Sequence, residues 1–345
     1  MNLEQLESTA KAMVVPGKGI LAADESTPTI KKRFDQINVK STEERRRYYR
    51  NMLFTAEVME NHISGVIMFD ETLRQSSLDG EVPFPKFLAD IGVIPGIKVD
   101  EGAKPLAGYE DEKVTEGLDG LRDRLAEYYD LGARFAKWRA VITIREDAPS
   151  FACIDANAHA LARYAALCQE ADIVPIVEPE VLMDGEHNIE ASFEVTAEVL
   201  NALFEALFRM DVYLEGTILK PNMVLSGYDC SEQASVDEVA EATVSCFQRF
   251  VPAAVPGVCF LSGGQSDLLA TQHLNAMNTI DDLVKPWQLS FSYGRALQQS
   301  ALKAWGGDDS NAEAAQKAFY HRAKCNGAAT LGQYSDKMEK EGAPA

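Results

Sequence analysis

Eight short apolar runs recur along this 345-residue chain, and their starts are spaced roughly 30 to 45 residues apart, as in βαβ units. They are residues 18–25 (KGILAADE), 63–70 (ISGVIMFD), 94–100 (IPGIKVD), 133–142 (ARFAKWRAVI), 173–180 (IVPIVEPE), 215–222 (EGTILKPN), 257–265 (GVCFLSGGQ) and 288–296 (QLSFSYGRA). The runs are continuous rather than alternating, which is typical of parallel strands buried on both faces. Segments with helical spacing lie between them, so the pattern predicts a (β/α)8 barrel.

The main alternative is an open doubly wound sheet, but the first run is not followed by the GxGxxG turn that is usual there. We therefore expect one TIM-barrel domain over residues 1–345, with an N-terminal helix, a core of about residues 10–326 and a mobile tail over 327–345. Residues 41–44 (STEE) and 235–238 (SVDE) fit the capping box and predict two helix starts.

The formal net charge of −20 argues against nucleic acid or an anionic membrane as the main partner. An anionic ligand must then be met by a local basic pocket. The N-terminal sequence lacks the features of a signal peptide, and no run of 18 apolar residues offers a membrane span. These features predict a cytoplasmic protein.

The six cysteines are scattered without a CxxC pair, which predicts reduced core residues rather than a disulfide framework. The five histidines lack HExxH or similar spacing. We therefore expect no catalytic metal and no cofactor, although three ligands from distant parts of the chain could still converge.

Charged and glycine-rich groups stand where the predicted strands end. They are Asp24, Glu25, Asp70, Glu71, Lys98, Asp100, Lys137, Arg139, Glu178, Glu180, Lys220, Ser262-Gly263-Gly264 and Gly294-Arg295. In a barrel, catalytic groups project from the C-terminal ends of the strands. The pattern thus predicts one reaction site at the barrel mouth.

Lys220 closes the run EGTILKPN, and Pro221 cannot extend a strand ladder, so Lys220 is expected at a strand end. One interpretation is a lysine that points into water. The other is an imine-forming nucleophile, which must be uncharged when it attacks. Burial and a nearby cation such as Lys137 both favour the uncharged amine.

Glu178 and Glu180 are separated by one residue, so on a strand they face the same way. Two close carboxylates repel each other and favour protonation of one member, which suits a proton shuttle. The alternative is ion pairing with Lys137 or Arg139, and the two interpretations can hold for different members.

Residues 261–266 (LSGGQS) place two glycines between a strand and a predicted helix. Free backbone amides at a helix N-terminus predict an anion site, and the seventh and eighth strands of barrels often bind phosphate. Arg295 can add a bidentate clamp. The alternative is a simple turn.

Taken together in this order, the motifs GILAADEST, GIKVD, FAKWR, IVPIVEPE, LEGTILKPN, FLSGGQS and FSYGRALQ resemble class I fructose-1,6-bisphosphate aldolases over about residues 10 to 330. The resemblance implies metal-free, Schiff-base cleavage of fructose 1,6-bisphosphate to dihydroxyacetone phosphate and glyceraldehyde 3-phosphate, in glycolysis and gluconeogenesis. It also implies a homotetramer.

By this resemblance Lys220 forms the imine, and Glu178, with Glu180 as its partner, is the general acid/base. Lys137 keeps Lys220 uncharged, and Asp24 takes or orients the C4 hydroxyl proton. The residues that match the C1-phosphate site are Ser262, Gly263, Gly264, Gly294 and Arg295. Those that match the C6-phosphate and sugar-hydroxyl contacts are Arg33, Lys98 and Arg139, with Thr29 as a further substrate-binding residue.

Two departures from the family pattern stand out. Residues 26–29 read Ser-Thr-Pro-Thr where members commonly read Ser-Thr-Gly-Ser, and proline fixes φ and removes a donor. This puts the preference for a bisphosphate in question. Animal members end in a tyrosine that assists proton transfer on the enamine, whereas this chain ends EGAPA, and Tyr334 is a poor positional match. That step then uses another group or runs more slowly.

Three alternatives stay open at this point. One is a related Schiff-base aldolase acting on fructose 1-phosphate or sedoheptulose 1,7-bisphosphate. Another is a non-catalytic binding scaffold, which predicts loss of at least one of Lys220, Lys137, Glu178 and Asp24, yet all four are present. The third, a zinc-dependent aldolase, is disfavoured by the histidine pattern.

Overall fold

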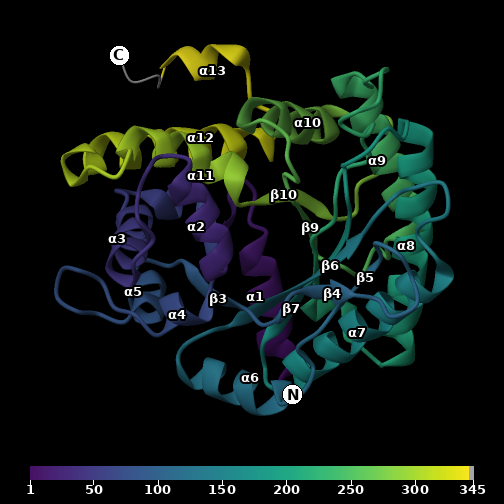
Figure 1. The fold of residues 1–345 in the computed structure, drawn as a ribbon, viewed down its shortest axis with the longest axis horizontal. Coiled ribbons are helices and arrows are strands. Elements are labelled where there is room, and N and C mark those ends of the chain that lie inside the picture. The colour runs from purple at the N-terminus through teal and green to yellow at the C-terminus, as the bar shows by residue number, and fades with distance from the viewer. Residues whose placement is uncertain (342–345) are drawn as a thin grey trace.

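The computed structural model describes residues 1–341 and shows a closed barrel of eight parallel strands surrounded by helices (Figure 1). The barrel strands are β1 (Gly19–Ala23), β2 (Ile63–Met68), β3 (Ile94–Lys98), β6 (Phe135–Ile142), β7 (Val174–Val181), β8 (Ile218–Leu219), β9 (Gly257–Phe260) and β10 (Gln288–Tyr293). They pair in the order β1-β10-β9-β8-β7-β6-β3-β2, and β2 closes the ring on β1. Each of the eight apolar runs contains one strand, so the predicted barrel is confirmed.

Helices connect the strands and form the outer layer (Figure 1). They are α1 (Leu3–Met13), α2 (Thr27–Asp35), α3 (Glu43–Phe54), α4 (Asp70–Leu73), α5 (Phe84–Asp90), α6 (Leu121–Asp130), α7 (Phe151–Glu170), α8 (Ile189–Arg209), α9 (Val236–Phe250), α10 (Asp267–Thr279), α11 (Arg295–Trp305), α12 (Ala312–Ala329) and α13 (Asp336–Glu341). A small antiparallel hairpin, β4 (Ala103–Pro105) and β5 (Lys113–Thr115), lies outside the barrel. No helix within residues 1–341 is both long and apolar enough to cross a membrane.

The N-terminal end of the barrel is filled with apolar side chains, and α1 closes it. Leu6, Ala10 and Met13 of α1 are buried in one cluster with residues from the barrel strands, among them Ile20 and Phe135. The charged side chains of the barrel strands lie toward the opposite, C-terminal end; they are Lys98, Lys137, Arg139, Glu178 and Glu180. The fold thus leaves one open mouth for chemistry.

One of the two predicted capping boxes forms as expected. Ser235 and Glu238 satisfy each other's backbone donors at the start of α9. The box predicted over 41–44 is wrong by one residue, because Thr42 rather than Ser41 caps α3 and accepts from Arg45 N at 3.2 Å. Arg46 donates to the Ser41 carbonyl at 3.1 Å and holds Ser41 outside the helix.

Part of the predicted tail packs on the barrel's outer helices. Residues 336–341 form α13, and Arg322 of α12 pairs with Glu339 of α13 at 2.6 Å. Residues 342–345 lie outside the described part of the chain, so the mobility of the tail stays a prediction. The six cysteines, all within the described residues, are free; five are buried, as predicted, and Cys230 is half-buried.

The Phe135 ring of β6 lies directly against Gly96 of β3. A Cβ added at Gly96 would lie 2.2 Å from the ring, and Phe135 is fully buried. We expect Gly96→Ala to cost about 1–3 kcal/mol of unfolding free energy because the ring must leave its packed position. Urea unfolding measures this, and adding Phe135→Leu should restore part of the loss. An unchanged midpoint in Gly96→Ala would contradict this packing.

Candidate active site

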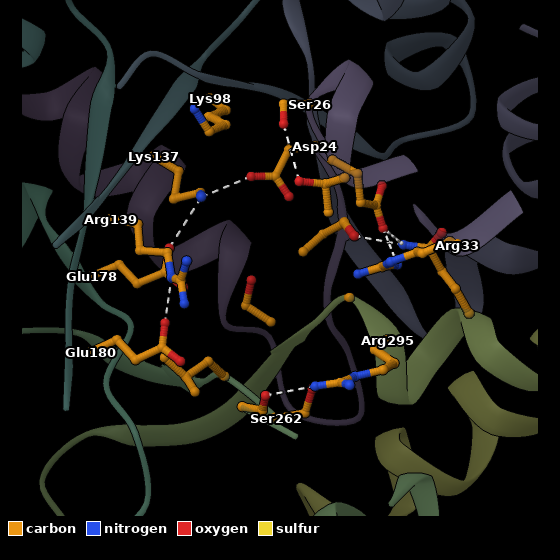
Figure 2. Close-up of a pocket in the computed structure, with 18 of the residues that line it drawn as sticks. Asp24, Ser26, Arg33, Lys98, Lys137, Arg139, Glu178, Glu180, Ser262 and Arg295 are labelled. Atoms are coloured by element: carbon orange, nitrogen blue, oxygen red, sulfur yellow. Dashed lines mark hydrogen bonds and ion pairs between the residues drawn. The ribbon is translucent and has the colours of Figure 1, made fainter. Parts of the chain in front are cut away.

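A cavity of about 410 Å³ opens at the C-terminal ends of the barrel strands. The predicted site residues that line it are Asp24, Thr29, Arg33, Lys98, Lys137, Arg139, Glu178, Glu180, Lys220, Ser262, Gly263, Gly294 and Arg295. Gly264 is the one that does not, although it lies beside the cavity, since a Cβ there would be 3.2 Å from Arg295 Nη2. The structure therefore brings the predicted residues to one place (Figure 2).

Strand register sets the positions of the central residues. Arg139 on β6 is the partner of Glu178 on β7, and Lys98 on β3 is the partner of Lys137 on β6. Lys220 directly follows β8, and its backbone N–H donates to Val177 at 2.8 Å. The prediction that Lys220 sits at a strand end is confirmed. Its side chain is not in water, because the residue is only 4% exposed.

Two buried lysines, the buried Glu178 and the partly exposed Asp24 form a chain of ion pairs. Lys220 Nζ lies 3.2 Å from Glu178 Oε1, and Lys137 Nζ lies 3.2 Å from Glu178 Oε2. Lys137 Nζ is also 2.8 Å from Asp24 Oδ2. Glu178 thus lies between both lysines, one at each carboxylate oxygen.

The Lys137–Asp24 end of this chain is a stable charge pair. Burial alone would lower the pKa of Lys137, but Asp24 and Glu178 outweigh it and raise that pKa above its ordinary value. Burial would likewise raise the pKa of Asp24, but Lys137 and Lys220 hold it well below its usual range. At neutral pH Lys137 is therefore an ammonium and Asp24 a carboxylate.

The two glutamates of β7 face the same way, as predicted, and each meets a cation. Glu180 accepts a hydrogen bond from Arg139 Nε, and Glu178 pairs with Lys137 (Figure 2). Glu178 also pairs with Lys220. The ion-pairing interpretation is therefore confirmed for both Glu178 and Glu180. Their mutual repulsion is offset by these cations, and the shuttle role of Glu178 stays a prediction.

The loop between β9 and α10 lies on another side of the cavity. Gly263 has a φ of +63°, which favours glycine, and a Cβ there would meet Met183 at 2.5 Å. Ser266 caps α10, so the helix N-terminus points toward this loop. Arg295, the first residue of α11, donates to the Gly263 carbonyl at 2.8 Å. An anion bound here would meet backbone amides, a helix N-terminus and a guanidinium.

The basic residues occupy two sides of the cavity. Figure 2 shows Lys98, Lys137 and Arg139 on one side and Arg33 and Arg295 on the other. The sequence resemblance grouped Arg33 with Lys98 and Arg139, but the structure places it on the Arg295 side, because α2 follows β1 and β1 pairs with β10.

The loop that departs from the family pattern begins a helix. Ser26 stands at the N-cap of α2, and Pro28 lies in the first turn, where a missing N–H is tolerated. The hydroxyl oxygens of Ser26 and Thr29 lie 3.1 Å apart. Pro28 therefore does not prevent the hydroxyls of Ser26 and Thr29 from lying together at this edge of the cavity.

Three of the charged residues predicted at strand ends do not line the cavity: Asp70, Glu71 and Asp100, the last of which pairs with Lys98 at 2.7 Å. Asp70 and Glu71 begin α4 directly after β2, and neither lines the cavity. Glu71 pairs with Arg46 at 2.5 Å, and Asp70 accepts from Tyr128 at 3.0 Å. The prediction that every strand end sends charge into the mouth is wrong at β2, because the helix starts too early.

Sequence reasoning missed the partners of Glu25. This buried carboxylate accepts from Arg33, from Arg50 of α3 at 2.5 Å, and from Gln298 of α11 at 3.0 Å. Arg50 is 3% exposed, and its position in the sequence carries no signal of this contact. Tyr334, the remaining tyrosine near the C-terminus, does not line the cavity, and its hydroxyl donates to Glu339 at 2.8 Å.

Comparisons with known proteins agree on one family. A family model described as fructose-bisphosphate aldolase class-I matches residues 5–344. A probable fructose-bisphosphate aldolase class 1 of Xylella fastidiosa is 62% identical over 97% of this chain and 99% of its own length. The cytosolic fructose-bisphosphate aldolase 4 of Arabidopsis thaliana is 54% identical over 98% of this chain and 86% of its own length.

A solved structure has the same fold. It is the fructose-bisphosphate aldolase of Plasmodium falciparum, in complex with TRAP and a small-molecule inhibitor. The TM-score is 0.94 and the identity 48%, over 96% of this chain and 95% of that one.

We expect Glu25→Gln to leave the Arg50 guanidinium buried without a carboxylate, at a cost of about 3–5 kcal/mol of unfolding free energy. Burial would raise the pKa of Glu25, but Arg33 and Arg50 outweigh it and lower that pKa below its ordinary 4.5. The stabilisation is therefore present above pH 4.5 and is lost as the pH falls further. Urea unfolding at several pH values measures the difference between the wild type and the variant.

The control is Glu313→Gln, which breaks the exposed pair with Lys317 and should leave the stability nearly unchanged. Equal effects of the two substitutions, or a Glu25→Gln effect that does not shrink in acid, would contradict the role assigned to Glu25.

Proposed function

Because this chain belongs to the class-I fructose-bisphosphate aldolase family, we propose that Lys220 carries out the family's reaction through an imine. The reaction is the reversible cleavage of fructose 1,6-bisphosphate to dihydroxyacetone phosphate and glyceraldehyde 3-phosphate, a lyase activity of glycolysis. The observation that supports Lys220 most directly is that it is buried and lines the cavity with its amine 3.2 Å from Glu178.

The first step requires an uncharged amine. Transfer of one proton from Lys220 to Glu178 turns that ion pair into a neutral amine and a neutral acid. The Lys137–Asp24 pair, at 2.8 Å, stays charged throughout, and the Lys137 cation disfavours a second positive charge on Lys220. Lys220 then attacks the C2 ketone.

Imine formation releases one water molecule. The carbinolamine hydroxyl leaves once it has received a proton, and Glu178 lies within reach of Lys220 to supply it. Glu180 is held beside Glu178 by its ion pair with Arg139.

The protonated imine is the electron sink for breaking the C3–C4 bond. The bond electrons move to the imine nitrogen and leave an enamine. The C4 hydroxyl gives its proton to the Glu178 carboxylate, which donated its own proton when water left, and C4 becomes the aldehyde carbon. Asp24 has a pKa held well below its usual range, and such a carboxylate is a weak base. We therefore assign Asp24 to orienting the C4 hydroxyl rather than to keeping its proton.

The two phosphates are assigned to different parts of the mouth. The C1 phosphate binds at the loop of Ser262, Gly263 and Gly264 with Gly294 and Arg295, supported by the amides and guanidinium that meet there. The C6 phosphate and the sugar hydroxyls bind near Lys98, Arg139 and Thr29, whereas Arg33, beside Gly294, faces the C1 side. These basic groups supply the local positive pocket that a chain of net charge −20 needs for an anionic substrate.

We further propose that the protein works in the cytoplasm as a homotetramer. The first part is supported by relatives whose names describe them as cytosolic. The second rests on the resemblance to the family. The Tyr334 hydroxyl is engaged by Glu339, so we assign enamine protonation to a group other than Tyr334.

Cleavage of fructose 1,6-bisphosphate in the presence of EDTA tests the proposed function. We expect the rate to be unchanged by the chelator, because protonated imine and lysine side chains do the work of a metal. Loss of cleavage with EDTA that returns with zinc would overturn the imine mechanism.

Two variants test the assignment of the phosphates. Arg295→Ala should lower kcat/KM on fructose 1,6-bisphosphate and fructose 1-phosphate alike, because both substrates carry a C1 phosphate. Lys98→Met should lower kcat/KM roughly 10- to 100-fold on the bisphosphate alone, because it removes one charge-assisted hydrogen bond to the C6 phosphate. Equal losses of Lys98→Met on both substrates would contradict the assignment of Lys98 to the C6 side.

A further inference from the structure

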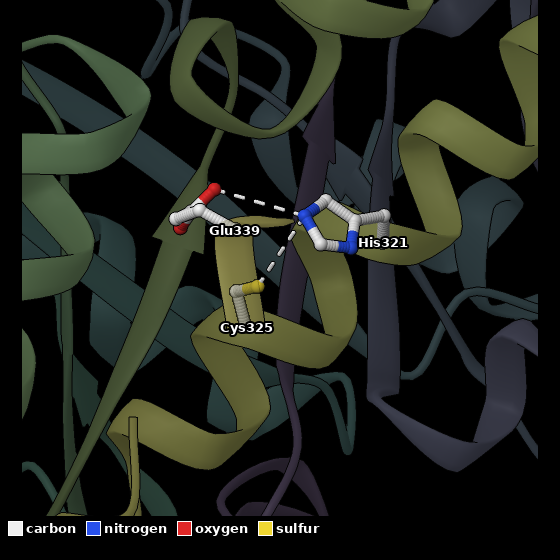
Figure 3. A group of neighbouring side chains, drawn as sticks. All are labelled: His321, Cys325 and Glu339. Carbon is white, nitrogen blue, oxygen red and sulfur yellow. Dashed lines mark hydrogen bonds and ion pairs between the residues drawn. The ribbon is translucent and has the colours of Figure 1, made fainter. Parts of the chain in front are cut away.

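A second cluster of chemically reactive side chains lies far from the barrel mouth, between α12 and α13. His321 and Cys325 are one turn apart on α12 and therefore share one helix face. Glu339 of α13 faces both of them (Figure 3). Among residues 1–341, this is the group whose imidazole, thiol and carboxylate atoms converge within 4.8 Å of one another.

The spacing of these atoms is that of ligands around a small metal ion. His321 Nε2 lies 3.7 Å from Cys325 Sγ and 3.6 Å from Glu339 Oε2. A tetrahedral zinc with Zn–N of about 2.0 Å and Zn–S of about 2.3 Å separates its ligand atoms by about 3.3 to 3.6 Å. Little movement is needed to place an ion between the three.

We propose that His321 Nε2, Cys325 Sγ and a carboxylate oxygen of Glu339 bind one zinc ion. The donor set of one nitrogen, one sulfur and one oxygen suits zinc, whereas calcium and magnesium prefer oxygen ligands alone. The three ligands do not form a recognisable sequence motif, because the third comes from a different helix.

Glu339 retains room for a metal despite its other partners. Its Oε1 accepts from Arg322 Nη2 at 2.6 Å and from Tyr334 at 2.8 Å, which uses both lone pairs. Its Oε2 accepts from Arg322 Nη1 at 2.9 Å and keeps one lone pair on the side of His321. Such outer contacts orient a ligating carboxylate.

The cluster borders a cavity on the side of His321 and Cys325, although Cys325 itself is buried. His321 and Cys325 line a cavity of about 570 Å³ that also includes Tyr320, Lys324 and Met338. Zinc can enter through this cavity, and water can take the fourth position. None of the residues lining it belongs to the cavity at the barrel mouth. The ion would therefore fasten α13 to α12 and take no part in aldol cleavage.

The test uses the full-length chain without an affinity tag, stripped by EDTA and titrated with Co²⁺ and then with Zn²⁺. We expect one equivalent of Co²⁺ to bind with a thiolate-to-cobalt charge-transfer band, and Zn²⁺ to displace it. His321→Gln and Cys325→Ala should each weaken binding by at least about tenfold, and Cys325→Ala should abolish the band. Zinc should raise the thermal midpoint of the wild type and of neither variant.

Cys230→Ala is the matched control, since this half-buried cysteine lies outside the cluster and should leave metal binding and the band unchanged. Substituting Glu339 is avoided because it would also break the ion pair with Arg322. Absence of stoichiometric binding, or binding that survives both His321→Gln and Cys325→Ala, would overturn the proposal and leave an Arg322–Glu339–Tyr334 network without a metal.

Discussion

The site depends on the two ion pairs of the Glu178 carboxylate. One oxygen lies 3.2 Å from the Nζ of Lys220 and the other lies 3.2 Å from the Nζ of Lys137, and both lysines are buried. Burying two ammonium groups side by side costs much free energy unless an equal number of carboxylates balances their charge. Asp24 supplies the second negative charge through Lys137. The result is a neutral group of four charges within which a proton can move from Lys220 to Glu178 without creating net charge.

The barrel is what makes this arrangement rigid. Asp24 comes from the end of β1, Lys137 from β6, Glu178 from β7 and Lys220 from the end of β8, so one site joins four strands. The apolar cluster under α1 fills the other end of the barrel and keeps water from that side. Because β6 and β7 are paired over their full lengths, the spacing between Lys137 and Glu178 is set by backbone register rather than by flexible loops.

Sequence reasoning reached the barrel and most of the mouth because continuous apolar runs and strand-end charges are local patterns. It failed where the outcome depends on distant partners. Nothing near Glu25 in the chain points to Arg50, and the burial of both decides their contact. Asp70 was misplaced because the early start of α4 is not visible in the run before it. The convergence of Cys325 with Glu339 likewise required the fold of α13 against α12.

The most direct test of this account is to trap the imine. The protein is incubated with dihydroxyacetone phosphate, reduced with borohydride, digested and analysed by mass spectrometry, with Lys220→Arg as the control. We predict one stable adduct on Lys220 and none in the variant. An adduct on another lysine, such as Lys137, or no adduct in a wild-type protein that still cleaves its substrate, would contradict it.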